Sequence, residues 1–151
     1  MAAAYISVIG PSEATAEQEA DAEAIGRALA QAGAIVVTGG RGGVMAAASR
    51  GAVEAGGITV GLLPGTDRAT ANEWVAIAIP TGLGELRNGL VVRTGDAVVA
   101  VGGAYGTLSE VALALRAQVP VIGLRTWDIE GIEVVEDPQE AAARALERAA
   151  R

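Results

Sequence analysis

The chain has 151 residues, a formal net charge of −7 and 51% hydrophobic residues, which is typical of one acidic globular domain. It contains no cysteine, histidine or lysine, which excludes a disulfide framework, thiolate chemistry, a Ser-His-Asp triad, a Schiff-base lysine and a Walker-A lysine. The acidic balance argues against nucleic acid or an anionic membrane surface as a partner.

The N-terminal half alternates between short apolar runs, which predict strands, and longer stretches with apolar residues at helical spacing. The first helix carries a capping-box pattern, with Thr15 as N-cap, Gln18 three residues later and Gly33 as its stop. The strands are apolar throughout, which is typical of a parallel sheet buried on both faces. In chain order the expected elements are strand 5–9, helix 15–32, strand 34–38, helix 44–55 and strand 58–63.

The C-terminal half continues this alternation after an irregular stretch at residues 64–73. That stretch is long for a connection in a compact domain, so we expect a functional loop, in which Asp67, Asn72 and Trp74 are candidates to line a base pocket. For Trp74 we favour a place in a strand at the edge of the core. The further expected elements are strand 74–79, helix 85–94, strand 96–101, helix 107–117, strands 120–124 and 132–135, and helix 138–150.

This order of elements predicts an α/β fold. We expect a single Rossmann-like domain over residues 1–151, with a doubly wound parallel sheet of about seven strands flanked by helices. Ligands of such sheets bind at the carboxyl ends of the strands, near the point where the strand order reverses. Two glycine-rich loops follow strands of this sheet, so both are expected at that edge.

The loop at residues 102–107 lies between an apolar strand and a helix. Free N–H groups and the positive end of the helix dipole meet at such a place, which suits a phosphate. Thr107 is expected to cap the helix and to donate its hydroxyl. Glu110 is expected in the first helical turn, where it either complements the helix dipole or faces the ribose of a ligand as acceptor or general base.

The loop at residues 39–43 contains four glycines around Arg41. We favour a second anion cradle, in which Arg41 pairs with phosphate in a bidentate manner, over a flexible turn with a solvated arginine. Arg87 and Asn88 lie early in the helix before the fifth strand, and Arg87 either converges with Glu110 or is a solvated surface cation. Two phosphate-type loops in one domain point to a nucleotide-like ligand.

Together these residues resemble the lysine-decarboxylase-like nucleotide-binding superfamily, which includes the Lonely Guy (LOG) phosphoribohydrolases, the molybdenum-cofactor carrier proteins and more distant relatives of the DNA-processing protein DprA. The resemblance runs from Ile6 to about Val135. Its glycine motifs are Gly-Gly-Arg-Gly-Gly-Val-Met at residues 39–45 and Gly-Gly-Ala-Tyr-Gly-Thr-Leu-Ser-Glu at residues 102–110. In this fold the helices around Arg87 and Gly106 commonly pack in dimers, so the resemblance implies a homo-oligomer, either a dimer or a tetramer.

Within the superfamily the chain is most similar to the carrier branch. The similarity lies in Ile-Pro-Thr-Gly at residues 79–82, in Leu-Arg-Asn at residues 86–88, and in Gly102, where the hydrolases have proline. Ala104 stands where the loop usually has glycine, and a positive φ at that position would strain an alanine.

The hydrolases carry a Met-His-x-Arg-Lys motif, and Arg87 falls on its arginine. Glu110 falls on the final glutamate of the hydrolase loop motif, so the pair implicated in N-glycosidic cleavage is present. The flanking residues differ from those of the hydrolases: Gly84, Glu85 and Asn88 replace Met, His and Lys, and Ser109 replaces the glutamate before Glu110.

Three functions remain open at this point. The first is binding of a phosphate-bearing nucleotide-like or pterin cofactor, such as molybdenum cofactor. The second is LOG-type hydrolysis of a nucleoside 5′-monophosphate such as AMP to free base and ribose 5-phosphate, with Arg87 and Glu110 as catalytic residues. The third is nucleotide sensing through a partner. Whether the protein is an enzyme is therefore left undecided.

The candidate ligand-binding residues come from both glycine loops and their neighbours, and no metal site is expected. The partner is a small phosphorylated ligand, not nucleic acid or a membrane. The absence of a signal-peptide pattern and of a long apolar run favours a cytoplasmic location. The candidates are Gly10, Ser12, Gly39, Gly40, Arg41, Gly42, Gly43, Arg87, Asn88, Gly102, Gly103, Ala104, Tyr105, Gly106, Thr107 and Glu110.

Overall fold

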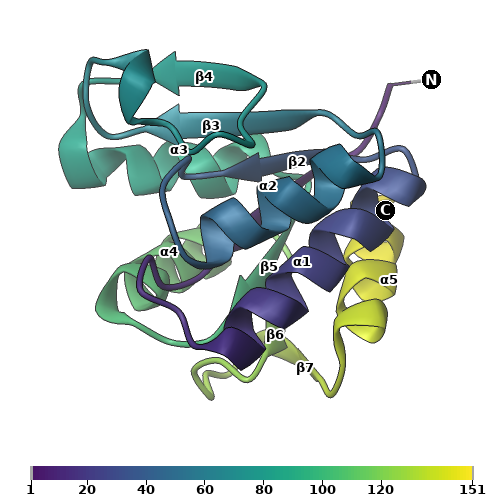
Figure 1. Cartoon of the computed structure of the whole chain (residues 1–151). Helices are drawn as coiled ribbons and strands as arrows, with labels where there is room; N and C mark the ends of the chain where they lie inside the picture. Colours follow the sequence, from purple (N-terminus) through teal and green to yellow (C-terminus); the bar gives the residue numbers. More distant parts are fainter. Residues whose placement is uncertain (1, 151) are drawn as a thin grey trace.

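Seven parallel strands form one sheet in the order β4-β3-β2-β1-β5-β6-β7 in the computed structural model, which describes residues 2–150 (Figure 1). Each neighbouring pair of strands is parallel. The α/β prediction is confirmed. The strands are β1 (Tyr5–Ile9), β2 (Ile35–Thr38), β3 (Thr59–Leu63), β4 (Ile77–Pro80), β5 (Ala97–Val101), β6 (Val121–Leu124) and β7 (Ile132–Val135).

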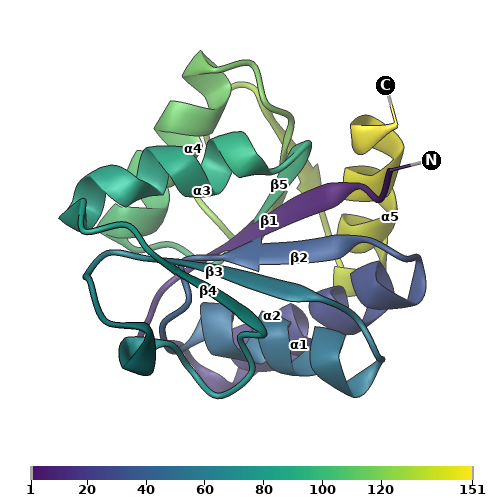
Figure 2. The same ribbon diagram turned by 90° about the horizontal axis from the view of Figure 1, so that it is seen from above.

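Helices cover both faces of this sheet, so the molecule has three layers (Figure 2). Helices α1, α2 and α5 cover one face, and α3 and α4 cover the other. None of the helices within residues 2–150 is long and apolar enough to cross a membrane. The helices are α1 (Ala16–Gln31), α2 (Val44–Glu54), α3 (Arg87–Thr94), α4 (Tyr105–Arg116) and α5 (Pro138–Ala149), with short 3-10 turns η1 (Arg68–Thr70) and η2 (Gly84–Leu86).

Each face of the sheet has its own hydrophobic core. Successive strand residues point to opposite faces, so Val36 lies in the core under α1 and α2, whereas Val37 lies in the core under α3 and α4. The central strand β5 is accordingly apolar and buried along its whole length, as the sequence predicted, whereas the edge strand β4 is partly exposed.

The strand order reverses between β1 and β5. The chain runs from β1 outwards to β4 at one edge, returns through α3, and places β5 beside β1, where Ser7 pairs with Val98. The loops after β1, β2 and β5 consequently leave the sheet at the same carboxyl edge, on either side of the switch point. This arrangement brings both glycine loops to one edge, as expected for a ligand site in a doubly wound sheet.

Helix α1 begins as predicted, while strand β4 differs from the expectation at both ends. Thr15 and Gln18 form the complete capping box. Strand β4 occupies Ile77–Pro80 instead of residues 74–79, because the hydroxyl of Thr59 donates to Trp74 O and accepts from Ala76 N, which holds that segment in a turn. Trp74 therefore precedes the strand.

Helices α1 and α2 cross with their backbones almost in contact. A Cβ added to Gly26 would lie 1.9 Å from the carbonyl oxygen of Ala48, and one added to Gly51 would lie 2.0 Å from that of Glu23. The contact is reciprocal, since each glycine lies against a carbonyl of the other helix. Two glycines in helix interiors, each costing about 1 kcal/mol relative to alanine, are thus explained by packing.

Candidate functional site

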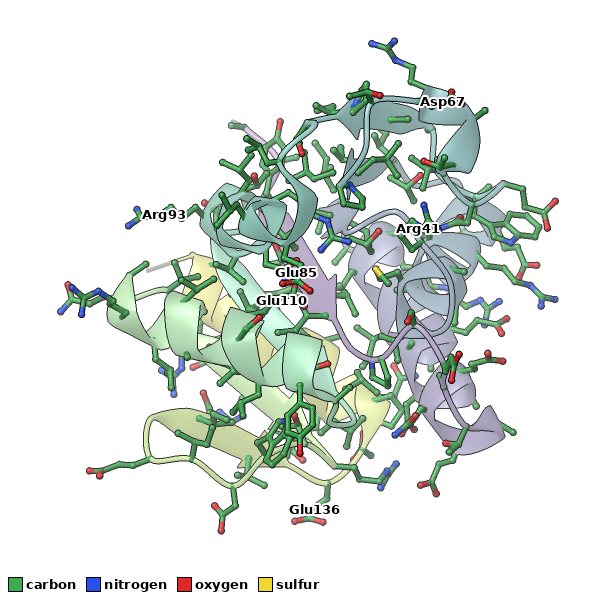
Figure 3. All side chains as sticks on the ribbon, turned by 90° about the vertical axis from the view of Figure 1, so that its left-hand side faces the viewer. Arg41, Asp67, Glu85, Arg93, Glu110 and Glu136 are labelled. Atoms are coloured by element: carbon green, nitrogen blue, oxygen red, sulfur yellow. The ribbon has the colours of Figure 1, made fainter. Side chains whose placement is uncertain are left out.

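A cavity of about 600 Å³ opens at the carboxyl edge of the sheet, at the switch point. Its wall comes from the loops after β1, β2 and β5, the start of α3 and the first turns of α4. Figure 3 shows Glu85 and Glu110 near the centre of the view, with Arg41 on the neighbouring loop and Asp67 well away from them. The cavity is lined by ten of the candidate residues: Gly10, Ser12, Arg41, Gly42, Arg87, Asn88, Ala104, Gly106, Thr107 and Glu110.

The first glycine loop contributes Arg41 and Gly42 to the wall of this cavity. Gly43 has φ +59° and packs so closely that a Cβ would lie 2.3 Å from Pro11 O, so only glycine fits there. Within residues 2–150, the N–H groups of Arg41, Gly42 and Gly43 make no hydrogen bond, whereas Gly40 N donates to Thr38 Oγ1. This loop therefore offers free donors next to an exposed guanidinium.

The second glycine loop ends in a helix that begins earlier than expected. Ala104 is the N-cap of α4 and has φ −131°, so this alanine is unstrained, and Thr107 is not the cap. Thr107 lies in the first turn, is 2% exposed, lines the cavity, and its hydroxyl has no hydrogen-bond partner among the described residues. The first N–H groups of α4 also lack intrahelical partners.

Arg87 enters the cavity from the N-terminus of α3. Its guanidinium donates to Asn88 Oδ1 and makes a long contact of 3.5 Å to Gly39 O, while its Nε is buried and has no hydrogen-bond partner within residues 2–150. A Cβ on Gly39 would lie 2.8 Å from the guanidinium, so glycine makes room for it. Burial lowers the pKa of Arg87, Glu110 opposes this effect, and Arg41 adds to it. An arginine nonetheless stays charged.

A hydrogen-bond path joins Arg87 to the second glycine loop. Asn88 Nδ2 donates to Ser109 Oγ at 3.3 Å, and Ser109 Oγ donates to Gly106 O at 2.7 Å. Together with the contact between Arg87 and Gly39, this path runs from one glycine loop to the other. We call it the loop-to-loop path.

Glu110 lies in the second turn of α4, so the expectation of a first-turn carboxylate on the helix dipole is wrong. Its side chain is 7% exposed and lines the same cavity as Arg87. Burial raises the pKa of Glu110 to about 7, and the positive charge of Arg87 partly offsets that rise. No salt bridge joins the two side chains within the described part of the chain. The cavity therefore holds a carboxyl that changes charge near neutral pH.

The other candidates lie outside the lining of the cavity. Tyr105 is 85% exposed and stacks on Trp127, with ring centroids 6.4 Å apart. Asp67, Asn72 and Trp74 do not line the cavity either; Trp74 lies under the guanidinium of Arg50. The remaining candidates outside the lining are backbone positions of the two loops, namely Gly39, Gly40, Gly43, Gly102 and Gly103.

Five residues of the lining were not among the sequence candidates. Pro64 was detectable in principle, because it follows the carboxyl end of β3. Glu85 was also detectable, because it lies two residues before Arg87 at the position of the hydrolase histidine. Met45 lies in the first turn of α2, where only the fold shows that its side chain faces the cavity. The five are Pro11, Met45, Pro64, Gly84 and Glu85.

Comparison with known proteins places this chain in a family. Residues 3–150 match the sequence profile of the SLOG cluster4 family. The molybdenum cofactor binding protein of the phototrophic bacterium Rippkaea orientalis has a TM-score of 0.92 and 37% identity, over 100% of this chain and 99% of that one. The molybdenum cofactor carrier protein of Chlamydomonas reinhardtii has a TM-score of 0.91 and 37% identity, over 99% and 100% of the two chains.

A protein of Archaeoglobus fulgidus, described as uncharacterized, is 40% identical over 137 residues, which is 90% of each chain. The resemblance to the carrier branch, which the two glycine motifs and Arg87-Asn88 predicted, is confirmed by the solved structures. The family match covers nearly every residue of the fold. The chain therefore belongs to the SLOG cluster4 family.

Proposed function

We propose that this protein binds a phosphate-bearing cofactor or nucleotide, with a pterin of the molybdenum-cofactor type as the favoured class. The single observation that carries the proposal is the convergence of two glycine loops, with free N–H groups, on a cavity that also contains Arg41 and Arg87. Donors and fixed positive charge at one point are what a phosphate group requires. The similarity to molybdenum cofactor carriers supports the pterin class.

The polar groups of the cavity fit such a ligand. Thr107 Oγ1 and Arg87 Nε are buried and lack a partner among the described residues, and a buried donor without an acceptor is costly. The oxygens of a phosphate or of a pterin would supply the acceptors. A volume of about 600 Å³ also lies within the usual range for sites of small ligands. When bound, the cofactor would bring its own metal chemistry, while the residues of this chain hold and orient it.

Replacing Arg87 tests the proposal directly. Arg87→Ala should weaken the binding of AMP and of inorganic phosphate, measured by isothermal titration calorimetry, by about 10- to 100-fold, because charge-assisted hydrogen bonds are lost. Arg87→Lys should recover little, since lysine lacks the planar fork of donors. Arg93, on the same helix, is not part of the cavity lining, and Figure 3 shows it at the outer edge of the molecule. Arg93→Ala is therefore the matched control, and wild-type protein that binds neither probe would overturn the proposal.

A LOG-type phosphoribohydrolase is the second candidate function. The observation that favours it is the buried Glu110 beside Arg87, since a carboxyl with a pKa of about 7 suits proton transfer at neutral pH. Against it, Gly102 has φ +70°, a conformation closed to the proline of the hydrolases. Release of adenine from AMP, followed by chromatography and abolished in Glu110→Gln, would establish the enzyme. Saturable binding of AMP without release would favour the carrier.

We also propose that the protein is a homo-oligomer through the face formed by α3 and α4. Among residues 2–150, no other segment covers the outer side of these helices (Figure 2), and Leu86 at the N-cap of α3 is 78% exposed, with Leu90 and Leu113 also exposed. A second copy would bury these side chains. Leu90→Glu should shift the mass measured by light scattering to that of a monomer. Ile58→Glu, at a similarly exposed site just before β3, should leave the mass unchanged.

A further inference from the structure

The segment between β3 and β4 is fastened to the first glycine loop by one residue, Asn72. Its backbone N–H donates to Gly40 O at 2.9 Å. Its side-chain Nδ2 donates to Arg41 O at 2.8 Å. Asn72 therefore holds two successive carbonyl groups of the loop, although it does not line the cavity itself.

Other contacts fix the orientation of the Asn72 side chain. Its Oδ1 accepts a hydrogen bond from Trp74 N at 2.9 Å, which leaves Nδ2 directed at Arg41 O. Trp74 is fixed in turn, because its carbonyl oxygen accepts from the buried hydroxyl of Thr59 at 2.6 Å. The donor that reaches the glycine loop is thus anchored on β3 before any ligand binds.

Because the peptide bond is planar, fixing the carbonyl groups of the loop also fixes the direction of its N–H groups. In a trans peptide the C=O of one residue and the N–H of the next point in opposite directions. Because the carbonyls of Gly40 and Arg41 point towards Asn72, the N–H groups of Arg41 and Gly42 point away from it. Arg41 and Gly42 are the residues of this loop that line the cavity. Both N–H groups are also free of partners within residues 2–150.

We infer that Asn72 is a positioning residue, which aims the N–H groups of the first glycine loop at an anionic ligand. The inference rests on the proposed function, because it assigns the loop an anion to bind. It also replaces the expectation that Asn72 lines a base pocket. Without the side chain of Asn72, the peptide group that carries Arg41 O is free to turn this oxygen towards the cavity, where it would repel an anion, and the neighbouring glycines make such a turn easy.

Two variants of Asn72 separate this role from that of a turn former. Asn72→Ala removes both side-chain contacts, whereas Asn72→Asp keeps an acceptor for Trp74 N but has no donor for Arg41 O. Aspartate forms such turns as well as asparagine does. We expect both variants to bind inorganic phosphate about tenfold more weakly than the wild type. Thr70→Ala, which removes a contact within the same segment that does not reach the glycine loop, is the control and should bind as the wild type does.

Calorimetric titration with inorganic phosphate and urea unfolding should be run on all four proteins. A role in stability alone would lower the free energy of unfolding and leave the dissociation constant for phosphate unchanged, which would overturn the inference. Wild-type affinity in Asn72→Asp would overturn it too, because turn formation would then suffice. Absence of phosphate binding by the wild type would overturn the proposed function instead, so the two failures are distinguishable.

Discussion

Gly26→Ala should destabilise the protein by about 4 kcal/mol, although alanine is the better helix former by about 1 kcal/mol. The reason is the crossing of α1 and α2, where the added Cβ would lie 1.9 Å from Ala48 O. A carbonyl group in a helix cannot move aside as a flexible side chain can, so the two helices must separate. The free-energy cost of this overpacking is larger than the gain in helix propensity. Urea unfolding followed by circular dichroism measures the change.

Gly89→Ala provides the matched control on a different helix. Gly89 lies within α3, and a Cβ there would meet nothing within 4 Å. Only the difference in helix propensity then affects stability, so this variant should be more stable than the wild type by about 1 kcal/mol. If Gly26→Ala were as stable as the wild type, the backbones of α1 and α2 could not approach as closely as this structure places them.

Glu110→Gln should become more stable than the wild type as the pH rises. Burial raises the pKa of this carboxyl from its ordinary 4.5 to about 7. Between those values the folded protein binds a proton that the unfolded chain has released, so the contribution of Glu110 to stability is complete below pH 4.5 and is lost as the pH rises through about 7. Glutamine cannot ionise, and the variant should therefore gain roughly 3 kcal/mol relative to the wild type above pH 8.

Urea unfolding of both proteins, measured at half-unit steps from about pH 4.5 to about pH 8.5, checks this result. That range begins at the ordinary pKa of the carboxyl and extends beyond the raised pKa of about 7. Glu85→Gln is the control, because Glu85 lines the same cavity but is exposed. The difference in the free energy of unfolding between Glu85→Gln and the wild type should not follow the pH profile expected for Glu110→Gln. A constant difference for Glu110→Gln across the series would show that the carboxyl of Glu110 is not buried in the folded protein.

The sequence predicted the fold well because its signals there are local. Apolar runs, the Thr15 capping box and the glycine stops each report on a few neighbouring residues, and the parallel sheet follows from their order. The bounds of β4 could not be predicted, because they depend on the hydroxyl of Thr59, which holds the chain near Trp74 from a different strand. The start of α4 was also predicted too late. Threonine is favoured at N-cap positions, but in this structure the helix begins before Thr107.

The site was predictable to the extent that topology alone determines it. Strand ends of a doubly wound sheet meet at one edge, so the convergence of the two glycine loops followed from the order of elements. The sequence left open whether Arg87 converges with Glu110 or is a solvated surface cation. The raised pKa of Glu110 could not be predicted, because it results from burial, which the sequence does not show. The contact of Asn72 with Arg41 O was beyond prediction, since it joins side chain to backbone across 31 positions.

The loop-to-loop path has a consequence for how the cavity responds to its surroundings. Its side chains are those of Arg87, Asn88 and Ser109. An amide and a hydroxyl do not exchange their charge state with solvent protons, and a guanidinium keeps its charge throughout the physiological range. A change of pH near neutrality therefore leaves the charge of this path unchanged, whereas it changes the charge of Glu110 in the same cavity. The hydrogen bonds that join the two loops thus persist while the net charge of the lining varies, so a ligand meets a more negative cavity above neutrality than below it.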